Sequence, residues 1–258
     1  MSIYDTEQSV EKTFDENFIP EEQLQTQWSE FIELKKVISN LYNKNKKPIT
    51  ILDIGIGDGR VVKHICGIPE IWDCIGLYHG IDNANACLTI STKLIEALNI
   101  GNKAKVSFLE ANQLDTLTEK YDIVMTTWFT AGNFYPDDFS FTTYKNDDKK
   151  LNLDSNPRFE KIFLDGYNLL NPNGEIILGA VYIDSENTRK KQEYFYRKLG
   201  MEVITDQNDS FTATREKFWS QRFTQQKLLN YFQFVDPTKV TFTPLDTYDF
   251  AMQVSIKK

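Results

Sequence analysis

The sequence predicts an α/β protein built on a doubly wound, mostly parallel sheet. From residue 49 to about residue 199, short apolar segments alternate with segments of helical periodicity, the pattern of strand–helix–strand units. Segments such as ITILDI and EIILGAVY are apolar at nearly every position, as expected of strands whose two faces are both covered by helices. Two further apolar segments follow closely at the C-terminal end, and such neighbours predict an antiparallel closing strand.

The first 47 residues are predicted to form a helical arm or lid. Residues 20–43 have helical periodicity, with Pro20 and two glutamates at the start, and Pro48 ends the segment. The residues before Pro20 are polar with scattered aromatics and fit either a frayed terminus or an arm over the rest of the chain. Residues 48–258 are then the main domain.

The alternation in the main domain gives five strands, and two more follow in the last third, which departs from it. Asn156 and Thr224 are typical helix caps, and Asn171-Pro172-Asn173-Gly174 is a stop signal. Residues 201–220 show no clear pattern. The predicted strands are 49–54, 77–82, 105–110, 121–127, 175–182, 239–244 and 249–256, and the predicted helices are 58–66, 84–99, 156–170, 185–199 and 224–232.

Composition and charge narrow the functional class. The formal net charge of −8 disfavours nucleic acid as a partner, because a phosphate backbone is repelled by an acidic surface. No apolar run is long enough to span a bilayer, and the acidic start does not resemble a secretion signal. We therefore expect no membrane association. The three cysteines are an odd number without metal-type spacing, so we also expect no metal site and a reducing, cytoplasmic location.

The segment from Leu52 to Arg60 lies where the first strand turns into a helix. Its glycines, Gly55, Gly57 and Gly59, let the backbone approach a ligand closely. A dinucleotide site has the spacing G-x-G-x-x-G, whereas here the third glycine comes one residue early. Asp53 at the strand end would repel a pyrophosphate but attract an ammonium group, which favours a ligand with a cationic amino-acid end.

Polar side chains also follow the next strands. Asp82 ends the second strand, at the edge where ligands bind open α/β sheets, and its carboxylate can accept hydrogen bonds from ribose hydroxyls. Asn112 and Gln113 follow the third strand, and their amides can form hydrogen bonds with the amino group and a ring nitrogen of an adenine. Thr127 and Trp128, after the fourth strand, supply backbone groups and an aromatic wall.

Five motifs in this order resemble the class I S-adenosylmethionine-dependent methyltransferases of the small-molecule type. They are D-x-G-x-G-x-G from Asp53, G-I-D-N from Gly80, E-A-N-Q from Glu110, Y-D-I-V-M-T-T from Tyr121 and L-L-N-P-N-G-E-I-I-L from Leu169. The resemblance covers residues 49–182 and implies a Rossmann-like seven-stranded sheet with S-adenosylmethionine as cofactor. Asn112 departs from the family, which more often has Asp there. The cofactor-binding residues implied are Asp53, Gly55, Gly57, Asp82, Asn83, Asn112, Gln113 and Thr127.

A long connection, 129–155, is predicted to be an insertion that covers the substrate. Connections of this length inside a domain are functional or disordered, and its aromatic residues argue against disorder. Trp128, Phe129 and Tyr135 are candidate substrate contacts, and Arg222 is a fourth because it can pair with a carboxylate. The alternatives are a solvated loop, a second aromatic core and an ordinary surface arginine.

These residues predict an enzyme that methylates a small molecule on nitrogen, on a carboxylate or on another oxygen. Neither histidine is placed to act as a base, so no catalytic residue is assigned. The alternatives are a peptide or protein methyltransferase and a non-catalytic cofactor-binding module, with a nicotinamide-type oxidoreductase less favoured. The sequence gives no indication of the oligomeric state.

Overall fold

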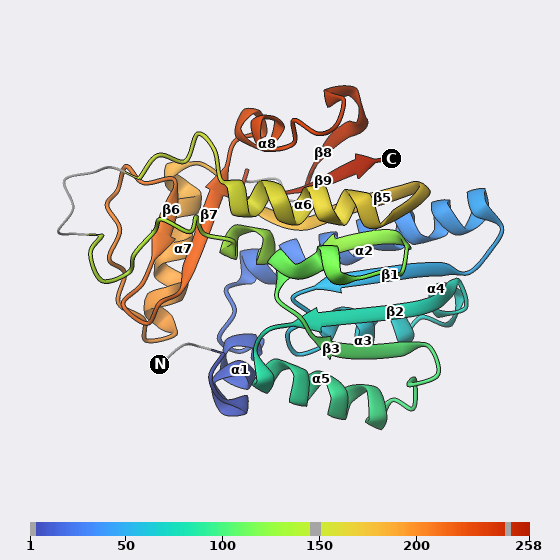
Figure 1. The fold of residues 1–258 in the computed structure, drawn as a ribbon. Coiled ribbons are helices and arrows are strands. Elements are labelled where there is room, and N and C mark those ends of the chain that lie inside the picture. The colour runs from blue at the N-terminus through green and yellow to red at the C-terminus, as the bar shows by residue number, and fades with distance from the viewer. Residues whose placement is uncertain (1–3, 145–150, 246–248) are drawn as a thin grey trace.

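The fold is organised around one mixed sheet with a parallel centre. The computed structural model describes residues 4–144, 151–245 and 249–258, and within these ranges the sheet has nine strands (Figure 1). Strands β3, β2, β1, β4 and β5 are neighbours in that order and parallel, and β9 pairs antiparallel with β5 and β8. The strands are β1 Ile49–Ile54, β2 Ile75–Asp82, β3 Ala104–Phe108, β4 Tyr121–Thr126, β5 Leu170–Ile183, β6 Phe211–Ala213, β7 Trp219–Phe223, β8 Val240–Pro244 and β9 Ala251–Lys257.

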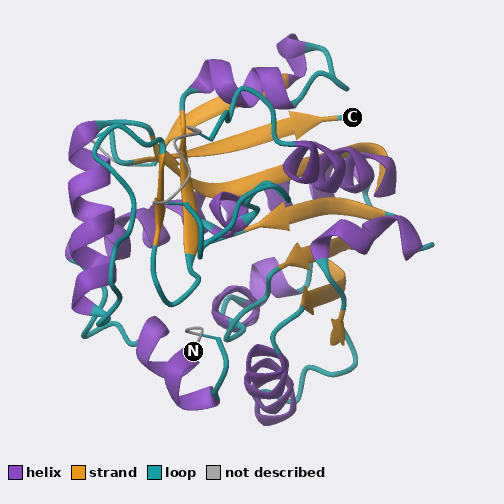
Figure 2. Ribbon diagram, turned by 60° about the vertical axis from the view of Figure 1, so that its left-hand side comes forward, coloured by secondary structure: helices purple, strands orange, loops and turns teal. Residues whose placement is uncertain are grey.

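Helices cover both faces of this sheet, as the apolar strands predict (Figure 2). Successive residues of a strand point to opposite faces, so Ile51 and Leu52 belong to two different cores. One core packs α2, α3, α4 and α5 on the sheet, and the other packs α6 and α8. The helices are α1 Glu7–Phe14, α2 Glu21–Asn45, α3 Arg60–Cys66, α4 Pro69–Trp72, α5 Asn85–Ala97, α6 Pro157–Leu169, α7 Glu186–Lys198 and α8 Gln225–Tyr231, with 3₁₀ turns η1 Ala111–Thr116, η2 Thr130–Asn133 and η3 Pro237–Lys239.

The predicted fold class is confirmed, with two differences in the strands. Residues 201–220 contain much of a hairpin of β6 and β7 that extends the far end of β5, which raises the strand number from seven to nine. Figure 1 shows β6, β7 and α7 grouped at one end of the sheet. Strand β5 also begins at Leu170, before the predicted stop signal, because Leu170 already pairs with Tyr121. The antiparallel pairing of β8 with β9 agrees with the prediction.

The described part of the first 19 residues forms a short helix packed on the main domain. Helix α1 begins with a capping box in which the Thr6 and Ser9 side chains cap each other's backbone amides. It lies against α5, where Lys93 Nζ and Glu7 Oε2 are 2.7 Å apart. The N-terminal arm therefore comes back to the same sheet edge at which β1 and β2 end.

Helix α2 buries most of the apolar positions of its helical pattern, but not all of them. Trp28 and Ile32 are 57% and 48% exposed, whereas the polar residues Gln23 and Glu30 are buried. Polar side chains on the buried face of a helix need partners there, and those of α2 are found near the sheet edge. In the described part of the chain, no helix combines the length and apolar character needed to cross a membrane.

Candidate active site

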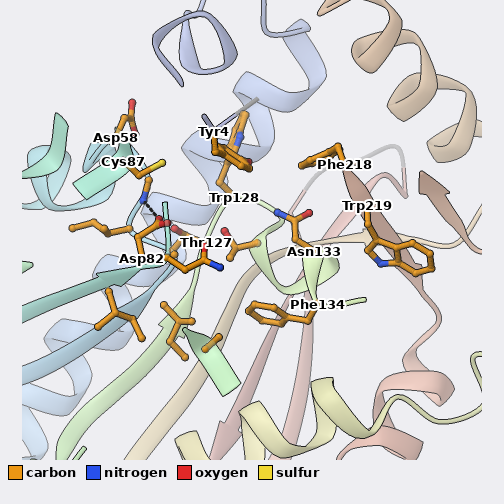
Figure 3. Close-up of a pocket in the computed structure, with 18 of the residues that line it drawn as sticks. Tyr4, Asp58, Asp82, Cys87, Thr127, Trp128, Asn133, Phe134, Phe218 and Trp219 are labelled. Atoms are coloured by element: carbon orange, nitrogen blue, oxygen red, sulfur yellow. Dashed lines mark hydrogen bonds between the residues drawn. The ribbon is translucent and has the colours of Figure 1, made fainter. Parts of the chain in front are cut away.

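A cavity of about 330 Å³ opens at the carboxyl edge of the parallel strands. Its volume lies at the low end for small-molecule sites. Figure 3 shows Asp82, Cys87 and Asp58 on one side of it and Phe218, Asn133 and Trp219 on the other. The cavity is lined by Tyr4, Phe14, Ile54, Gly55, Ile56, Gly57, Asp58, Arg60, Ile81, Asp82, Asn83, Cys87, Leu109, Ala111, Thr127, Trp128, Thr130, Asn133, Phe134, Tyr135, Arg158, Lys217, Phe218 and Trp219.

The turn between β1 and α3 forms the floor on the Asp82 side. Gly55, Gly57 and Gly59 have φ values of 78°, 57° and 79°, which other residues adopt only at a cost. A Cβ at Gly55 would lie 2.7 Å from Cγ2 of Thr130, and one at Gly57 would lie 3.2 Å from Cζ of Phe14. The turn therefore needs glycine for its conformation and for the close approach of neighbouring side chains.

Asp82 connects this turn to the end of β2. Its Oδ2 accepts a hydrogen bond from the Gly57 amide at 3.0 Å, drawn in Figure 3, and its Oδ1 accepts one from the Ala84 amide at 2.9 Å. Burial raises the pKa of Asp82, while these backbone donors lower it. Each carboxylate oxygen can accept a second hydrogen bond, so Asp82 keeps acceptor capacity on the cavity side.

Asp53 lies behind the cavity wall rather than in it. It is fully buried in β1, and its Oδ2 accepts a hydrogen bond from the Tyr78 hydroxyl at 2.5 Å. Its Oδ1 is buried without a hydrogen-bond partner among the described residues. Burial raises the pKa of Asp53 to about 7, although the Tyr78 hydrogen bond lowers it. A buried acceptor without a partner is costly, and a ligand donor is one way to satisfy it.

Glu30 is a second buried carboxyl group here, and sequence reasoning missed it. Its Oε1 accepts a hydrogen bond from the Trp128 amide at 3.0 Å, and burial raises its pKa to about 8. Gly179 leaves the space for it, since a Cβ there would collide with Oε1. The signal in the sequence is the row Gln23, Gln27 and Glu30, polar residues at helical spacing on one face of α2.

The chain leaves β4 in an unusual conformation. Trp128 and Phe129 have φ values of 50° and 62°, a left-handed geometry that costs non-glycine residues about 1–2 kcal/mol each. The two neighbouring rings stay in contact, with centroids 5.6 Å apart, but they lie in different surroundings. Trp128 lines the cavity with the Arg60 guanidinium 4.8 Å from its ring, whereas Phe129 stacks on Tyr182 at 3.7 Å in a buried cluster.

The far side of the cavity is aromatic and basic. Tyr135 lines it, as do Phe134, Phe218 and Trp219. The Arg158 guanidinium lies 5.1 Å from the Tyr135 ring, and Lys217 is the second basic group there. Sequence reasoning named neither, although Arg158 directly follows the Pro157 that begins α6.

Asp53 and four other predicted site residues lie outside the cavity lining. Asn112 and Gln113 lie in η1 next to the lining residue Ala111; the Asn112 Oδ1 is buried without a partner among the described residues, and Gln113 is exposed. Phe129 is turned away as described above. Arg222 is buried, with Nη1 donating to Gln192 at 2.6 Å and to Thr212 at 2.8 Å.

Arg222 and Trp219 differ by three positions in β7, so they face opposite sides of the strand. The prediction that Arg222 is a surface or substrate-facing arginine therefore does not fit this structure. Neither histidine lines the cavity. His79 is hydrogen-bonded to Tyr121 and Ser107, and burial lowers its pKa to about 4. Residues 145–150 of the predicted insertion lie outside the described residues.

Comparison with known proteins finds similarity to methyltransferases. No model of a known protein family matches the sequence. Over 190 residues the chain is 24% identical to the release factor glutamine methyltransferase of Lactococcus lactis subsp. lactis (strain IL1403), a match that covers 71% of this chain and 65% of that protein. The chain thus spans somewhat less than two thirds of this relative.

Solved structures resemble the whole fold at low sequence identity. A methyltransferase from Clostridium acetobutylicum ATCC 824, described as S-adenosylmethionine-dependent, matches with a TM-score of 0.56 at 11% identity, covering 96% of each chain. The magnesium protoporphyrin IX methyltransferase from Synechocystis PCC 6803 has a TM-score of 0.54 at 14% identity, covering 93% and 88%. The 1,6-didemethyltoxoflavin-N1-methyltransferase of Burkholderia thailandensis has 0.52 at 13%, covering 86% and 76%. The chain therefore has the fold of the class I S-adenosylmethionine-dependent methyltransferases.

Proposed function

We propose that this chain, which has the class I methyltransferase fold, binds S-adenosylmethionine in the cavity and methylates a small molecule. The observation that carries the proposal is the pairing of the Gly55–Gly59 turn with Asp82, which offers a close backbone approach beside a carboxylate with spare acceptor capacity. The structures of the Synechocystis and Burkholderia enzymes hold S-adenosylhomocysteine, the demethylated form of this cofactor.

The residues present fit the cofactor. Asp53 offers a buried, unpartnered Oδ1 behind the glycine turn, as a ligand ammonium group requires. Asp82 and Asn83 would hold the ribose, and Leu109 with Ala111 gives an apolar slot beside them for the adenine, next to the Asn112 amide. When bound, the sulfonium supplies an activated methyl group. Thr127 contributes lining at the end of β4, between the two sides of the cavity.

The chain's own part in the reaction is alignment and exclusion of water. Displacement at a methyl group needs little more than a nucleophile held in line with it. The aromatic residues Trp128, Tyr135, Phe218 and Trp219 form the acceptor side in this proposal. Nitrogen acceptors need only be neutral, which suits a cavity whose lining contains neither histidine. Acceptors with a carboxylate or another oxygen as nucleophile remain within the proposal.

The N-terminal arm, residues 1–47, is proposed as the lid. Tyr4 and Phe14 line the cavity, and the Phe14 carbonyl accepts a hydrogen bond from Arg60 Nη2 at 3.3 Å. Residues 48–258 are then the methyltransferase domain, with the insertion 129–155 forming part of the acceptor side through Tyr135. We propose a cytoplasmic location.

A protein acceptor is the second candidate, because the Lactococcus relative is named as a release factor glutamine methyltransferase. A peptide would have to reach the methyl group past Tyr4 and Phe14, which both line the cavity, so the closed arm favours a small molecule.

Methyl transfer can be measured directly with methyl-labelled S-adenosylmethionine. The purified chain is incubated with a mixture of metabolites and, separately, with a peptide mixture containing glutamine. We expect label in a small-molecule product and none in the peptides. Label in the peptides alone would favour the second candidate, and binding without transfer to either mixture would favour a non-catalytic module.

A further inference from the structure

The acceptor side of the cavity carries positive charge with no nearby lining carboxylate. Its charged lining residues are Arg158 and Lys217, both basic. The third basic lining residue, Arg60, follows the glycine turn and pairs there with Asp58 at 3.1 Å. The carboxylates in the lining are Asp58 and Asp82, and among the described residues both lie on the glycine-turn side (Figure 3). Charge in a ligand site is complemented by the ligand, so this side fits an anion although the whole chain is acidic.

The charge of Arg158 is only weakly compensated by the protein. Its single ion pair in the described residues is with Asp137, at 3.7 Å, and the Asp137 side chain is 82% exposed. Its Nε is buried and has no hydrogen-bond partner among the described residues. The Arg158 side chain as a whole is 23% exposed and lines the cavity, so its guanidinium has donors left for a ligand oxygen.

The surroundings of Arg158 hold its guanidinium in place. The guanidinium lies over the Tyr135 ring, 5.1 Å from its centre, and Arg158 is the second residue of α6, after Pro157. The cap residue Asn156 fixes the start of this helix, since its side chain accepts from the Phe159 amide and donates to the Phe134 carbonyl. A guanidinium that is fixed in this way suits the bidentate binding of an oxyanion.

Asn133 supplies a second unsatisfied group on the same side. Its Oδ1 is buried without a partner among the described residues, and Figure 3 shows its amide between Trp128 and Phe218. An amide carries both a donor and an acceptor, so Asn133 can form a hydrogen bond with a polar group of the ligand. The rings of Phe134, Tyr135 and Phe218 give flat apolar walls around these polar groups.

We infer that the methyl acceptor is a flat aromatic molecule with an oxyanion, a carboxylate or a phosphate, which Arg158 binds. This inference rests on the proposed function and specifies its substrate class. Lys217 adds charge without the fork geometry, and Asn133 orients the acceptor through its amide. The anion serves as the anchor of the acceptor on the side away from Asp82.

The test measures acceptor binding by calorimetry on the full chain saturated with S-adenosylhomocysteine. The probes are benzoate, 2-aminobenzoate and indole-3-carboxylate, each beside its uncharged amide, with phenyl phosphate as the phosphate arm. We expect at least one anion to bind roughly tenfold or more tightly than its uncharged counterpart, as for hydrogen bonds to a charged group. A preference for the acids identifies a carboxylate, and a preference for phenyl phosphate identifies a phosphate.

Variants tie the preference to Arg158. Arg158→Gln should abolish it and Arg158→Lys should keep part of it, while S-adenosylhomocysteine binding stays unchanged in both. Arg215→Gln is the matched control, because Arg215 is 71% exposed and pairs with Glu202 outside the cavity. If Arg158→Gln does not fold, Arg158→Lys carries the comparison.

The inference is overturned if acids and amides bind equally, if no anion binds the saturated protein, or if the Arg158 variants keep the full preference. Failure of S-adenosylhomocysteine itself to bind would instead overturn the proposed function, and this inference with it. The two failures are therefore distinguishable in the first titration.

Discussion

Asp82 has a structural and a binding task at the same time, because it holds the Gly57 and Ala84 amides while facing the cavity. Asp82→Asn keeps the shape of the side chain but loses its charge and one acceptor oxygen. Charge-assisted hydrogen bonds contribute about 1.5–3 kcal/mol each, so we expect S-adenosylhomocysteine affinity to fall at least tenfold by calorimetry. A moderate fall in melting temperature should accompany it, since the Gly57 turn is attached through the same carboxylate.

Asp73→Asn is the control for this substitution. Asp73 is an exposed carboxylate just before the other end of β2, far from the carboxyl edge. It should leave affinity unchanged. Equal affinity in the Asp82→Asn protein would show that Asp82 serves the turn only.

Glu30 predicts an unusual dependence of stability on pH. Its pKa in the folded chain is about 8, above its ordinary value near 4.5, so between these values the folded state holds a proton that the unfolded state has lost. The free energy of unfolding therefore falls as pH rises from about 5 to about 8, and Asp53, with a pKa of about 7, acts in the same direction. Glu30→Gln keeps an acceptor for the Trp128 amide but removes the titration.

We expect Glu30→Gln to flatten this decline and to be more stable than the unmodified chain at pH 8, measured by urea unfolding between pH 5 and pH 8.5. Glu33→Gln on the same helix is the control, because Glu33 forms an ion pair with the exposed Lys36, its one ion pair within the described ranges. Identical slopes for the Glu30→Gln protein and the unmodified chain would contradict burial of a neutral Glu30.

At the scale of elements, helix α1 is attached by contacts that cross the cavity mouth. The Phe14 ring lies over Gly57 and beneath the Arg60 guanidinium, 4.3 Å from the ring centre. Phe14→Ala removes both contacts without touching Asp82. We expect S-adenosylhomocysteine to dissociate severalfold faster, measured by stopped-flow fluorescence, because the arm then covers the ligand less tightly.

Tyr194→Ala controls for the loss of an aromatic ring, since Tyr194 is 63% exposed on α7 and does not line the cavity. Its dissociation rate should equal that of the unmodified chain. An unchanged rate in the Phe14→Ala protein would contradict the proposal that the N-terminal arm is a lid.

The elements around the cavity differ in how well the sequence predicts them. Local signals suffice for the apolar runs of β1, β2 and β4 and for α6 with its Asn156 cap. At the ligand edge, β1 is followed by Gly55 and β2 ends in Asp82. The hairpin of β6 and β7 lacks such signals. Strand β6 has only three residues, and Arg222 in β7 is buried through partners on α7 and β6, which no local pattern reveals.

The same distinction holds for the site residues. Gly55, Gly57 and Asp82 follow from position, because the ends of parallel strands meet at one edge. Glu30, Asn133 and Arg158 come from three separate elements, and only tertiary packing brings α2 and α6 to that edge. The sequence predicts that Phe129 contacts the substrate together with Trp128. In the structure, the left-handed backbone at both residues turns the Phe129 ring into the core.

At the scale of the whole molecule, an apolar core on each face of the sheet fixes the five parallel strands, and the carboxyl ends of these strands meet at one cavity. The arm from the N-terminus and the hairpin from the C-terminal third close that cavity from two sides. Segments distant in sequence thus form the two sides of the cavity that we propose for the cofactor and the acceptor.

The most direct test of this account is a calorimetric titration of S-adenosylhomocysteine into the unmodified chain, with NAD titrated in parallel. We expect saturable binding of one S-adenosylhomocysteine per chain and no heat from NAD, because the glycine turn and Asp82 suit a ribose and an amino-acid end but not a pyrophosphate. Absence of S-adenosylhomocysteine binding to the folded chain at millimolar concentration, or binding of NAD in its place, would contradict the central claim.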